Sequence, residues 1–458
     1  MKPLRLQAIA EAIGASYTGE LTVSGVSSDT RAIGEGSLFV AIRGERFDGH
    51  AFVAQAFEKG AAAAVLSDPA FAVEGRPCLV CPNTLDAMIQ IGGLYRSLFS
   101  EVRCVGVTGS VGKTTTKEML YAALSPFGKT LKTEGNQNNE IGMPRTLFQL
   151  TDDTRLAVIE MGMSGFGEIE PMTRAVRPEV AVLTNIGVSH LEKLGTRENI
   201  LAEKLSITRG LQGVRTLVLN EDNDLLSTVE RADGARRIIR ISLCDRDADI
   251  WADALSSDSD CTHFVVHYAD GAAYPARIPC LGKHNVYDAL LALGAAEAFG
   301  LDRATAVAGL QAYQTAGMRQ RVKRLAGITV IEDCYNASPD SMRASLALLG
   351  QNFGGARKAA VLADMLELGA RSAQMHRQVG RDAAAEGIDA LFCYGEQARL
   401  IAEGAREAGC KEVFSFDEKD QLAEALCRWL APGDCILVKG SRGMKLEEVL
   451  EIVYGAME

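Results

Sequence analysis

Apolar and polar positions change their pattern twice along the chain, which divides the sequence into three parts. Residues 1–85 mix short apolar runs, at 38–42 and 61–66, with turn-rich polar stretches. From Val102 onward, apolar segments of strand length alternate with segments of helical periodicity, and this alternation resumes at residue 328. Such alternation predicts parallel sheets flanked by helices, so we expect an α/β protein.

Three domains are expected from this division: a small α/β N-terminal domain over 1–85, a central domain over 86–315 and a C-terminal Rossmann-like domain over 316–458. The expected central strands are 104–107, 156–159, 180–183 and 216–219, with an antiparallel edge at 263–267 and helices at 285–299 and 303–313. The expected C-terminal strands are 328–331, 359–362, 390–394, 413–416 and 436–438, with helices at 372–386 and 422–430.

Composition narrows the class of protein. The chain has 458 residues, 47% hydrophobic and 23% charged, which excludes disorder and favours a globular multidomain protein. A net charge of −11 argues against a nucleic-acid partner. No uncharged apolar run reaches the roughly 18 residues of a transmembrane segment, and residues 1–20 lack the features of a secretion signal. We therefore expect a cytoplasmic protein with no transmembrane segment.

The cysteine pattern favours neither disulfides nor a metal site. Eleven cysteines, an odd number, are scattered through expected strands and helices, for example Cys104, Cys334 and Cys435, where we expect small buried apolar residues. Cys78 and Cys81 form a C-x-x-C, but no second pair or histidine lies nearby. We interpret this spacing as a coincidence within a strand.

The most specific local signal is V-G-V-T-G-S-V-G-K-T-T-T, from Val105 to Thr116. An apolar strand enters a glycine-bearing turn and then an amphipathic helix, so backbone N–H groups and the helix N-terminus converge on a phosphate. Lys113 can reach the terminal phosphates, and the hydroxyl of Thr114 can bind Mg²⁺. The pattern is the variant T-G-x-x-G-K-T-T, with Val107 where the full Walker pattern has glycine. The sequence therefore predicts a central P-loop-type mononucleotide-binding parallel sheet.

Two candidate metal ligands follow neighbouring strands of this sheet. Glu160 ends the strand at 156–159, and His190 follows the strand at 180–183 through a short loop. Because the carboxyl ends of parallel strands meet at one edge, both side chains are expected near the phosphate loop. Each of them alone would more often be a solvated or structural residue.

Longer motifs carry a resemblance to a known family. Residues 159–162 (I-E-M-G), 133–144 (T-E-G-N-Q-N-N-E-I-G-M-P) and 282–285 (G-K-H-N), together with the phosphate loop, resemble the Mur ligase superfamily, ATP-dependent amide-forming enzymes of peptidoglycan synthesis. Residues 333–342, 361–369 and 438–443 resemble the branch that joins D-Ala-D-Ala to UDP-N-acetylmuramoyl-tripeptide. Ser338 stands where the family commonly has Asn, and Ala363 where it commonly has Gly.

The resemblance implies ATP, two Mg²⁺ ions and a lysine carbamate formed from CO₂ as cofactors. ATP would phosphorylate the tripeptide carboxylate, and the amine of D-Ala-D-Ala would attack the acyl phosphate. The implied catalytic residues are Lys113, Lys204, His190 and Glu160, and the implied metal ligands are Thr114, Glu160, His190 and carbamylated Lys204. The neighbours of Lys204 depart from the usual A-K-G-E-I, and from the sequence alone this lysine reads as solvated.

The resemblance also implies where the substrates bind. The ATP-binding residues would be Thr108, Gly109, Ser110, Val111, Gly112, Lys113, Thr114, Thr115, His284, Asn285, Arg319, Asp333 and Tyr335. The residues that bind the UDP-tripeptide and the dipeptide would be Ser27, Ser28, Thr30, Arg31, Arg43, Asp48, Asn138, Asn139, Asn336 and Ser338. The N-terminal domain would hold the uridine end, and the C-terminal domain would bind D-Ala-D-Ala and close over ATP.

Alternative functions remain open. One alternative is another ligase of the superfamily. It could be the tripeptide-forming enzyme, although its D-N-P-R motif is absent here, or a folylpolyglutamate synthase-like enzyme. A nucleotide-dependent switch is another, although no Asn in the chain is followed by Lys, so the N-K-x-D motif for guanine is missing. We expect a monomer, and the sequence leaves open whether the tripeptide carries lysine or diaminopimelate.

Overall fold

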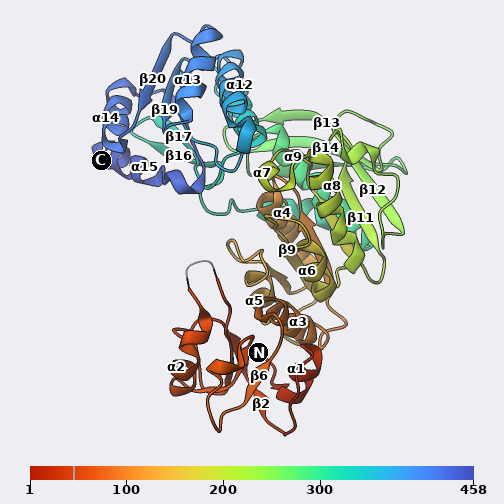
Figure 1. Ribbon diagram of the computed structural model, residues 1–458. Helices are drawn as coiled ribbons and strands as arrows, with labels where there is room; N and C mark the ends of the chain where they lie inside the picture. The colour runs from red at the N-terminus through yellow and green to blue at the C-terminus, as the bar shows by residue number, and fades with distance from the viewer. Residues whose placement is uncertain (45–46, 458) are drawn as a thin grey trace.

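Four sheets follow one another along the chain in the computed structural model, which describes residues 1–44 and 47–457 (Figure 1). The N-terminal region contains a two-stranded antiparallel sheet and a four-stranded parallel sheet of order β3-β4-β5-β6. Its elements are β1 (Leu4–Arg5), α1 (Leu6–Ala12), β2 (Thr22–Val23), β3 (Gly25–Ser27), β4 (Ser37–Val40), α2 (Val53–Glu58), β5 (Ala61–Leu66) and β6 (Cys78–Val80). The small α/β architecture is as predicted.

Helix α3 (Thr84–Arg96) joins the N-terminal region to the central one. Asn83 caps it, accepting a hydrogen bond from the backbone N–H of Leu85 over 2.9 Å. The helix packs against α1 on one side and against α5 (Gly142–Leu147) and α6 (Ile169–Val176) on the other. Tyr95 is fully buried, and its hydroxyl donates to the carbonyl of Leu150 over 3.0 Å. One continuous apolar core therefore spans both regions.

The central sheet has nine strands in the order β15-β14-β13-β12-β11-β10-β7-β9-β8. Its strands are β7 (Arg103–Thr108), β8 (Thr130–Lys132), β9 (Leu156–Glu160), β10 (Val180–Leu183), β11 (Thr216–Asn220), β12 (Arg237–Ser242), β13 (Ile250–Ser257), β14 (Thr262–Tyr268) and β15 (Ala273–Ile278). Pairing is parallel from β8 to β13 and antiparallel at β14 and β15. Strands β9 and β10 are buried on both faces, which explains their continuous apolar runs.

Helices cover both faces of the central sheet (Figure 1). Besides α5 and α6 they are α4 (Lys113–Leu124), α7 (Leu191–Leu194), α8 (Arg197–Leu205), α9 (Lys283–Ala298) and α10 (Arg303–Gly309). The helix expected at 303–313 is shorter than predicted, since α10 ends at Gly309 and a 3₁₀ turn, Leu310–Ala312, follows it. The parallel sheet and its antiparallel edge agree with the sequence prediction.

The C-terminal region contains a six-stranded sheet of order β16-β17-β21-β18-β19-β20. Its strands are β16 (Arg321–Leu325), β17 (Ile328–Asp333), β18 (Lys358–Ala363), β19 (Ala390–Tyr394), β20 (Glu412–Phe416) and β21 (Cys435–Lys439), and its helices are α11 (Pro339–Asn352), α12 (Ser372–Ala385), α13 (Ala398–Glu407), α14 (Lys419–Trp429) and α15 (Glu447–Met457). The five expected strands are present and mutually parallel. Strand β16, antiparallel and rich in basic residues, was not predicted.

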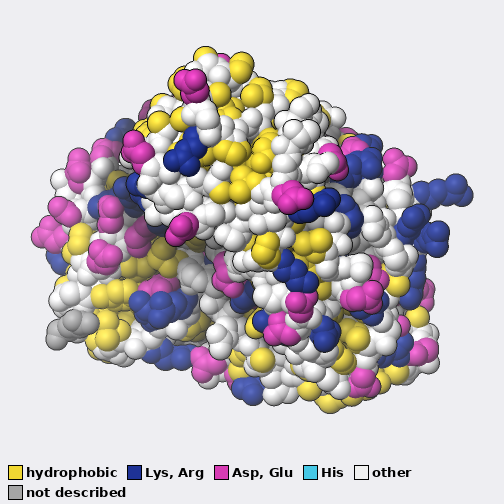
Figure 2. Space-filling view, turned by 90° about the horizontal axis from the view of Figure 1, so that it is seen from below, with side chains coloured by type: hydrophobic (Ala, Val, Ile, Leu, Met, Phe, Trp, Pro, Cys, Tyr) yellow, Lys and Arg dark blue, Asp and Glu magenta, His cyan; other side chains and the backbone are white. Residues whose placement is uncertain are grey.

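The surface of the protein carries charges of both signs. On the face shown in Figure 2, basic and acidic side chains are interspersed, and neither sign forms a continuous patch. Among the described residues, no helix combines the length and apolar character needed to cross a membrane.

All eleven cysteines are free, and Cys104, Cys334 and Cys435 are buried as expected, whereas Cys244 is exposed. Within 1–44 and 47–457, no group of three or more His, Cys, Asp or Glu side chains is arranged to hold a metal.

Candidate functional site

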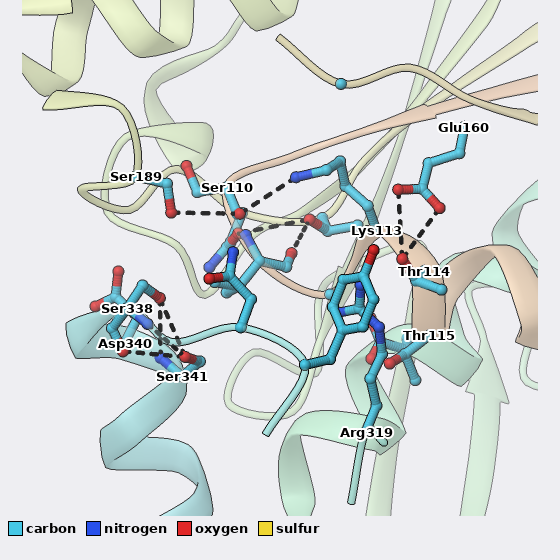
Figure 3. A pocket seen from close by; sticks show the side chains of 18 of the residues that line it. Ser110, Lys113, Thr114, Thr115, Glu160, Ser189, Arg319, Ser338, Asp340 and Ser341 are labelled. Atoms are coloured by element: carbon cyan, nitrogen blue, oxygen red, sulfur yellow. Dashed lines mark hydrogen bonds between the residues drawn. The ribbon is translucent and has the colours of Figure 1, made fainter. Parts of the chain in front are cut away.

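A cavity of about 530 Å³ lies where the carboxyl ends of β7, β9 and β10 face the C-terminal region. One wall is the phosphate loop between β7 and α4, and the opposite wall is the segment from Asp333 to Ser345 at the start of α11. Figure 3 shows Lys113 and Thr114 on one side and Ser338, Asp340 and Ser341 on the other. The cavity therefore lies between two regions that are far apart in the sequence.

The phosphate loop has the geometry that the sequence predicted for an anion site. Gly109 and Gly112 have φ values of +156° and +84°, and a side chain at Gly109 would collide with Thr184, so glycine is required there. No side chain caps the N-terminus of α4, which leaves its first N–H groups available to a ligand. The N–H of Val111 donates to Asn185 Oδ1 over 2.9 Å, which fixes the loop against the end of β10.

Lys113 and Lys204 both direct their amines at this loop. Lys113 Nζ donates to the carbonyl oxygens of Gly109 and Ser110 over 2.8 and 3.3 Å. Lys204 of α8 is 1% exposed and donates to the same Gly109 oxygen over 2.9 Å. Burial, followed by the charge of Lys113, lowers the pKa of Lys204 well below its usual value. The reading of Lys204 as a solvated helix residue is therefore wrong, since burial excludes water from this amine.

Glu160 and Thr114 meet at the carboxyl end of β9, as Figure 3 shows. The Thr114 hydroxyl donates to the two carboxylate oxygens of Glu160 over 3.1 and 3.3 Å, and Asn138 Nδ2 donates to Oε1 over 2.8 Å. Glu160 is 1% exposed, so it is not a solvated strand end. The sequence reading missed Lys117, a buried residue whose Nζ lies 4.0 Å from Glu160 Oε2 and donates to the carbonyl of Thr133.

His190 lies on the other side of the cavity, in the loop after β10. Its Nδ1 is 3.1 Å from Glu367 Oε2 of the C-terminal region. Burial and the charges of Lys113 and Lys204 lower the pKa of His190. Both partners have left-handed backbones, with φ of 63° at His190 and 62° at Glu367, a conformation that costs free energy in residues other than glycine. The structure thus places His190 at the boundary between two regions.

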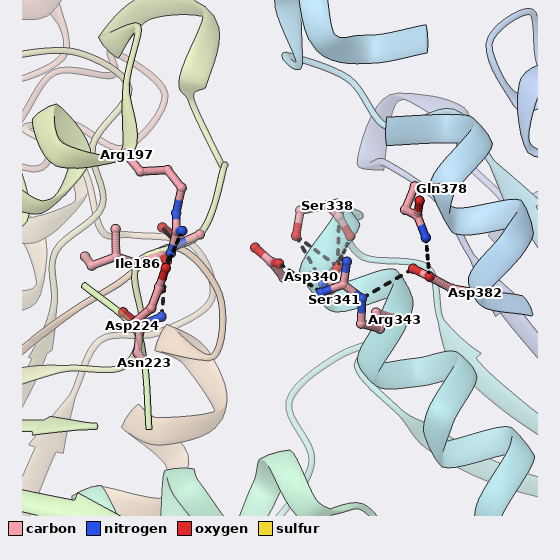
Figure 4. Close-up of polar contacts among 12 residues, drawn as sticks. Ile186, Arg197, Asn223, Asp224, Ser338, Asp340, Ser341, Arg343, Gln378 and Asp382 are labelled. Carbon is pink, nitrogen blue, oxygen red and sulfur yellow. Dashed lines mark hydrogen bonds and ion pairs between the residues drawn. The ribbon is translucent and has the colours of Figure 1, made fainter. Parts of the chain in front are cut away.

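Arg197 of α8 fixes the start of this loop, as Figure 4 shows. It donates to Asp224 over 2.7 Å and to the carbonyl of Ile186 over 2.7 Å, and Asn223 Nδ2 donates to the same carbonyl over 3.2 Å. The N-terminus of α11 faces the loop across the domain boundary, with Asp340 close enough to Gly187 that a side chain there would collide with it. The loop that carries His190 is thus held by both regions.

The candidate nucleotide-binding residues outside the loop line the same cavity. Arg319 places its guanidinium carbon 4.1 Å from the centre of the Tyr335 ring, a cation–π contact. Asp333 accepts hydrogen bonds from Lys439 Nζ and Ser345 Oγ, both over 2.6 Å, so its carboxylate already has two protein partners. The cavity is also lined by His284, Asn285, Thr115, Asn139, Asn336 and Ser338. Ser338 caps α11 through Ser341, and Thr108 at the end of β7 has a buried hydroxyl without a hydrogen-bond partner in the described part of the chain.

Asp288 of α9 is a buried carboxyl beside the phosphate loop that the sequence reading did not single out. Thr116 Oγ1 donates to Asp288 Oδ1 over 2.5 Å, and a side chain at Gly112 would contact the same oxygen. Burial raises the pKa of Asp288 from 3.8 to about 7. Below pH 7 this carboxyl is mostly protonated, and in that form it does not repel an anion bound to the loop.

We expect Asp288→Asn to stabilise the protein more at pH 8 than at pH 5. The folded pKa exceeds the unfolded one, so the unfolded chain ionises first and stability falls as the pH rises from 3.8 to about 7. At pH 8, ionisation of Asp288 lowers the free energy of unfolding by about 4 kcal/mol relative to a carboxyl that stays protonated. The asparagine can still accept the Thr116 hydrogen bond without titrating. Melting temperatures of both proteins at the two pH values measure the effect, and an equal difference at both would contradict it.

The loops predicted to hold the UDP end lie in the N-terminal region, outside this cavity. Ser27 forms a turn with Asp29, and the Thr30 hydroxyl donates to Gln55 Oε1 over 3.0 Å. Arg31 is paired with Asp29 over 2.7 Å and lowers the pKa of that carboxyl to about 2. Arg43 is paired with Asp48 over 2.9 Å. Glu45 and Arg46, which belong to the same predicted loop, lie outside the described residues.

Arg145 of α5 is a cation that the sequence reading missed. Its Nη2 donates to Ser28 Oγ over 3.0 Å, across the boundary between the N-terminal and central regions. Unlike Arg31 and Arg43, it forms no ion pair with any residue in 1–44 or 47–457. Asn136, Asn138, Asn139 and Glu140, which line the cavity, come shortly before α5. No local pattern marks Arg145, because its partner is distant in sequence.

Comparison with known families agrees with this arrangement. The Mur ligase middle domain matches residues 107–296, the Mur ligase glutamate ligase domain matches 318–442, and the Mur ligase family catalytic domain matches 22–87. The chain belongs to the Mur ligase family. Its members are ATP-dependent amide ligases, and the phosphate loop described above lies within the middle domain.

Individual Mur ligases are similar to this chain over nearly its whole length. A UDP-N-acetylmuramoyl-tripeptide–D-alanyl-D-alanine ligase of Bacillus subtilis is 39% identical over 436 residues, covering 94% of this chain and 93% of the relative. The crystal structure of MurF from Acinetobacter baumannii has a TM-score of 0.91 at 30% identity and covers 99% of both chains. MurF ligase from Thermotoga maritima, solved in complex with ADP, has a TM-score of 0.85 at 27% identity, covering 95% of this chain and 98% of that one.

Proposed function

We propose that this Mur ligase joins D-Ala-D-Ala to UDP-N-acetylmuramoyl-tripeptide in an ATP-dependent reaction, which completes the pentapeptide precursor of peptidoglycan. The observation that carries the proposal is the cavity in which the phosphate loop, Lys113 and the buried Glu160 face the C-terminal region, with the buried Lys204 bonded to the Gly109 carbonyl of the loop. The likeness to UDP-N-acetylmuramoyl-tripeptide–D-alanyl-D-alanine ligases over nearly the whole chain supports this substrate pair over those of other Mur ligases.

The chemistry requires two anions to approach each other. A carboxylate is a poor acyl donor, and transfer of the γ-phosphoryl group of ATP converts it to an acyl phosphate with a good leaving group. The amine of D-Ala-D-Ala then attacks the acyl carbon, and phosphate leaves. Lys113, whose amine lies over the loop, and the free N–H groups of α4 would offset the negative charge of the phosphates.

Mg²⁺ ions are part of the proposal, and the donors present fit them. Thr114 and Glu160 offer hard oxygen atoms within hydrogen-bonding distance of each other, next to the phosphate loop. Mg²⁺ is usually held by one or two carboxylates together with substrate phosphates, so the lack of a larger acidic cluster among the described residues is compatible with it. His190 and carbamylated Lys204 would hold a second ion. These ions would supply charge neutralisation at the reacting phosphate.

Carbamylation of Lys204 is supported by its surroundings. A neutral amine is needed to attack CO₂, and the product is an anionic carbamate with release of one proton. Burial favours the neutral, reactive form of this amine, because it lowers the pKa of Lys204 well below its usual value. Lys113 lies close enough to contribute to this shift and would stabilise the anionic product.

We further propose a division of labour among the three domains, 1–85 for the uridine end, 86–315 for ATP, and 316–458 for D-Ala-D-Ala and closure over ATP. Ser27, Ser28, Thr30, Arg31, Arg43 and Asp48 would contact the uridine diphosphate, and Asn138 and Asn139 would line the path to the cavity. Asn336 and Ser338 would face the incoming dipeptide. We propose a cytoplasmic enzyme, where ATP and nucleotide-linked precursors occur, and a monomer, which light scattering would report at 49.0 kDa.

A coupled phosphate-release assay tests the function. We expect ATP hydrolysis only when UDP-N-acetylmuramoyl-tripeptide and D-Ala-D-Ala are both present. The panel includes tripeptides ending in lysine and in diaminopimelate, and D-Glu, diamino acids and folate as competing substrates. Stimulation by one of these competitors instead of D-Ala-D-Ala would assign the chain to another branch of the family.

We also propose that Arg145, whose guanidinium bonds to Ser28, contacts the diphosphate of the UDP-substrate. Arg145→Ala should then raise the KM for the UDP-substrate about tenfold with little change in kcat, because this charge-assisted contact is lost. Initial rates at varied UDP-substrate and varied ATP measure the two KM values separately. Arg174→Ala is the matched control, since Arg174 is an arginine of α6 whose ion-pair partner among the described residues is Glu170 on the surface. A changed KM for ATP with an unchanged KM for the UDP-substrate would contradict this role.

A further inference from the structure

Gln320 connects the segment before β16 to two residues at the start of α9. Its Oε1 accepts a hydrogen bond from Asn285 Nδ2 over 2.9 Å, and its Nε2 lies 2.6 Å from His284 Nε2. Gln320 has φ of 53°, a left-handed backbone that a non-glycine residue adopts at a cost in free energy. All three residues line the cavity that contains the phosphate loop.

The direction of every amide in this chain of hydrogen bonds follows from one backbone carbonyl. Asn285 also donates to the carbonyl of Leu281 over 2.7 Å, and a carbonyl can only accept. The Asn285 NH₂ group must therefore face Leu281 and Gln320. The acceptor on Gln320 is then Oε1, which turns its NH₂ group toward His284.

The same reasoning fixes the tautomer of His284. Burial lowers the pKa of His284, so the ring is neutral near pH 7 and carries one proton. Because Gln320 Nε2 can only donate, His284 Nε2 must accept, and the proton resides on Nδ1. Both polar atoms of the Gln320 side chain are thus engaged in holding its neighbours.

One acceptor remains for a ligand. Asn285 Oδ1 accepts no hydrogen bond from the described residues, and Asn285 lines the cavity with its amide nitrogen held by two acceptors. An acceptor in this place favours a base with an exocyclic amine, such as adenine, over a base with an oxygen at the same position. Without the bond to Gln320, the Asn285 carboxamide could rotate and turn its NH₂ group toward the ligand. It could then bind a base with an amine or one with an oxygen at this position.

We propose that Gln320 is a positioning residue that sets the direction of the Asn285 carboxamide and thereby makes the nucleotide site selective for a 6-aminopurine over a 6-oxopurine. This inference rests on the proposed function, in which the base of ATP lies against Asn285. Because Gln320 directly precedes β16, its bonds to His284 and Asn285 also connect the C-terminal region to the site of the base.

Calorimetric binding of ADP and of inosine diphosphate, each with Mg²⁺, tests the proposal. Gln320→Leu removes both polar atoms at similar size, and we expect it to weaken ADP about tenfold while leaving inosine diphosphate within about threefold. Gln320→Glu keeps the acceptor for Asn285, so its preference for ADP should stay within about threefold of the native protein. Gln378→Leu is the matched control, because Gln378 is an exposed glutamine of α12 whose side-chain partner in the described part of the chain is Asp382 (Figure 4).

A ligand-free measurement tests the same chain of hydrogen bonds. Nitrogen chemical shifts of the His284 ring should report the Nδ1–H tautomer in the native protein. In Gln320→Glu, they should report the Nε2–H tautomer, because a carboxylate can only accept. The His284→Gln variant assigns the signals. This readout does not depend on nucleotide binding and remains available if Gln320→Leu proves poorly folded.

The outcomes separate the inference from the proposed function. An unchanged ADP preference in Gln320→Leu, or an Nε2–H tautomer in the native protein, would overturn the role of Gln320. If Asn285→Ala collapses the preference while Gln320→Leu does not, the base site stands and only the role of Gln320 fails. If Asn285→Ala also leaves the preference unchanged, the base does not lie at Asn285, and both assignments fail.

Discussion

Lys113→Ala is expected to lose turnover by on the order of a thousandfold while the protein remains folded. The lysine is the cation nearest the phosphates in the proposed complex, and alanine leaves their repulsion with the substrate carboxylate uncompensated. Within residues 1–44 and 47–457 its amine bonds to two carbonyl oxygens of its own loop and to no other group, so little stability should be lost. Phosphate release at saturating substrates, together with the melting temperature, measures both effects.

Lys129→Ala provides the control for this substitution. Lys129 is an exposed lysine shortly after the end of α4, the helix that begins with Lys113. It pairs with Asp153 on the surface. We expect its turnover to match that of the native protein. Near-native turnover in Lys113→Ala would exclude the phosphate-loop assignment.

Lys204→Ala is expected to lose most activity and to regain part of it when a short carboxylate such as formate or acetate is added. The substitution removes the proposed carbamate, and a small carboxylate can enter the space and supply the same anionic oxygen atoms. Because Lys204 is buried beside the loop, added acetate has a defined place to bind. Rates measured with and without carboxylate, at constant ionic strength, report the rescue.

Dependence on CO₂ gives the matching result for the native protein. Removal of dissolved CO₂ and bicarbonate should lower native turnover, and their return should restore it, whereas Lys204→Ala should not respond. The lowered pKa of Lys204 favours carbamate formation near neutral pH, since the neutral amine is the reactive form. Loss of activity in Lys204→Ala without any rescue, together with CO₂-independent native turnover, would exclude carbamylation.

The fold was largely predictable because its strands are buried on both faces. Strands such as β9 and β10 are continuous apolar runs, which sequence patterns detect directly. Strand β16 was missed because its residues are mostly charged and partly exposed, and it owes its place to pairing with β17. The 3₁₀ turn after α10 was missed because helical periodicity continues across it.

The site was predictable where it is local in sequence. Gly109 to Thr115 form one contiguous motif, and Glu160 directly ends a strand of the same sheet. Arg145 and Gln320 have partners in other regions of the chain, so no spacing rule identifies them. The burial of Lys204 likewise depends on the docking of α8 against the phosphate loop, which the pattern of α8 alone does not reveal.

The shared packing of α3 has a consequence for how the molecule unfolds. A single apolar core includes Leu6 and Leu38 from the N-terminal region and Ile159 and Leu183 from the central sheet, whereas the C-terminal sheet has two cores mostly its own. The first two regions should therefore melt as one cooperative unit, and the C-terminal region as another, which differential scanning calorimetry would resolve as two transitions. A fragment that ends before α3 would expose the face that Leu6 and Ile9 share with this core and should not fold by itself.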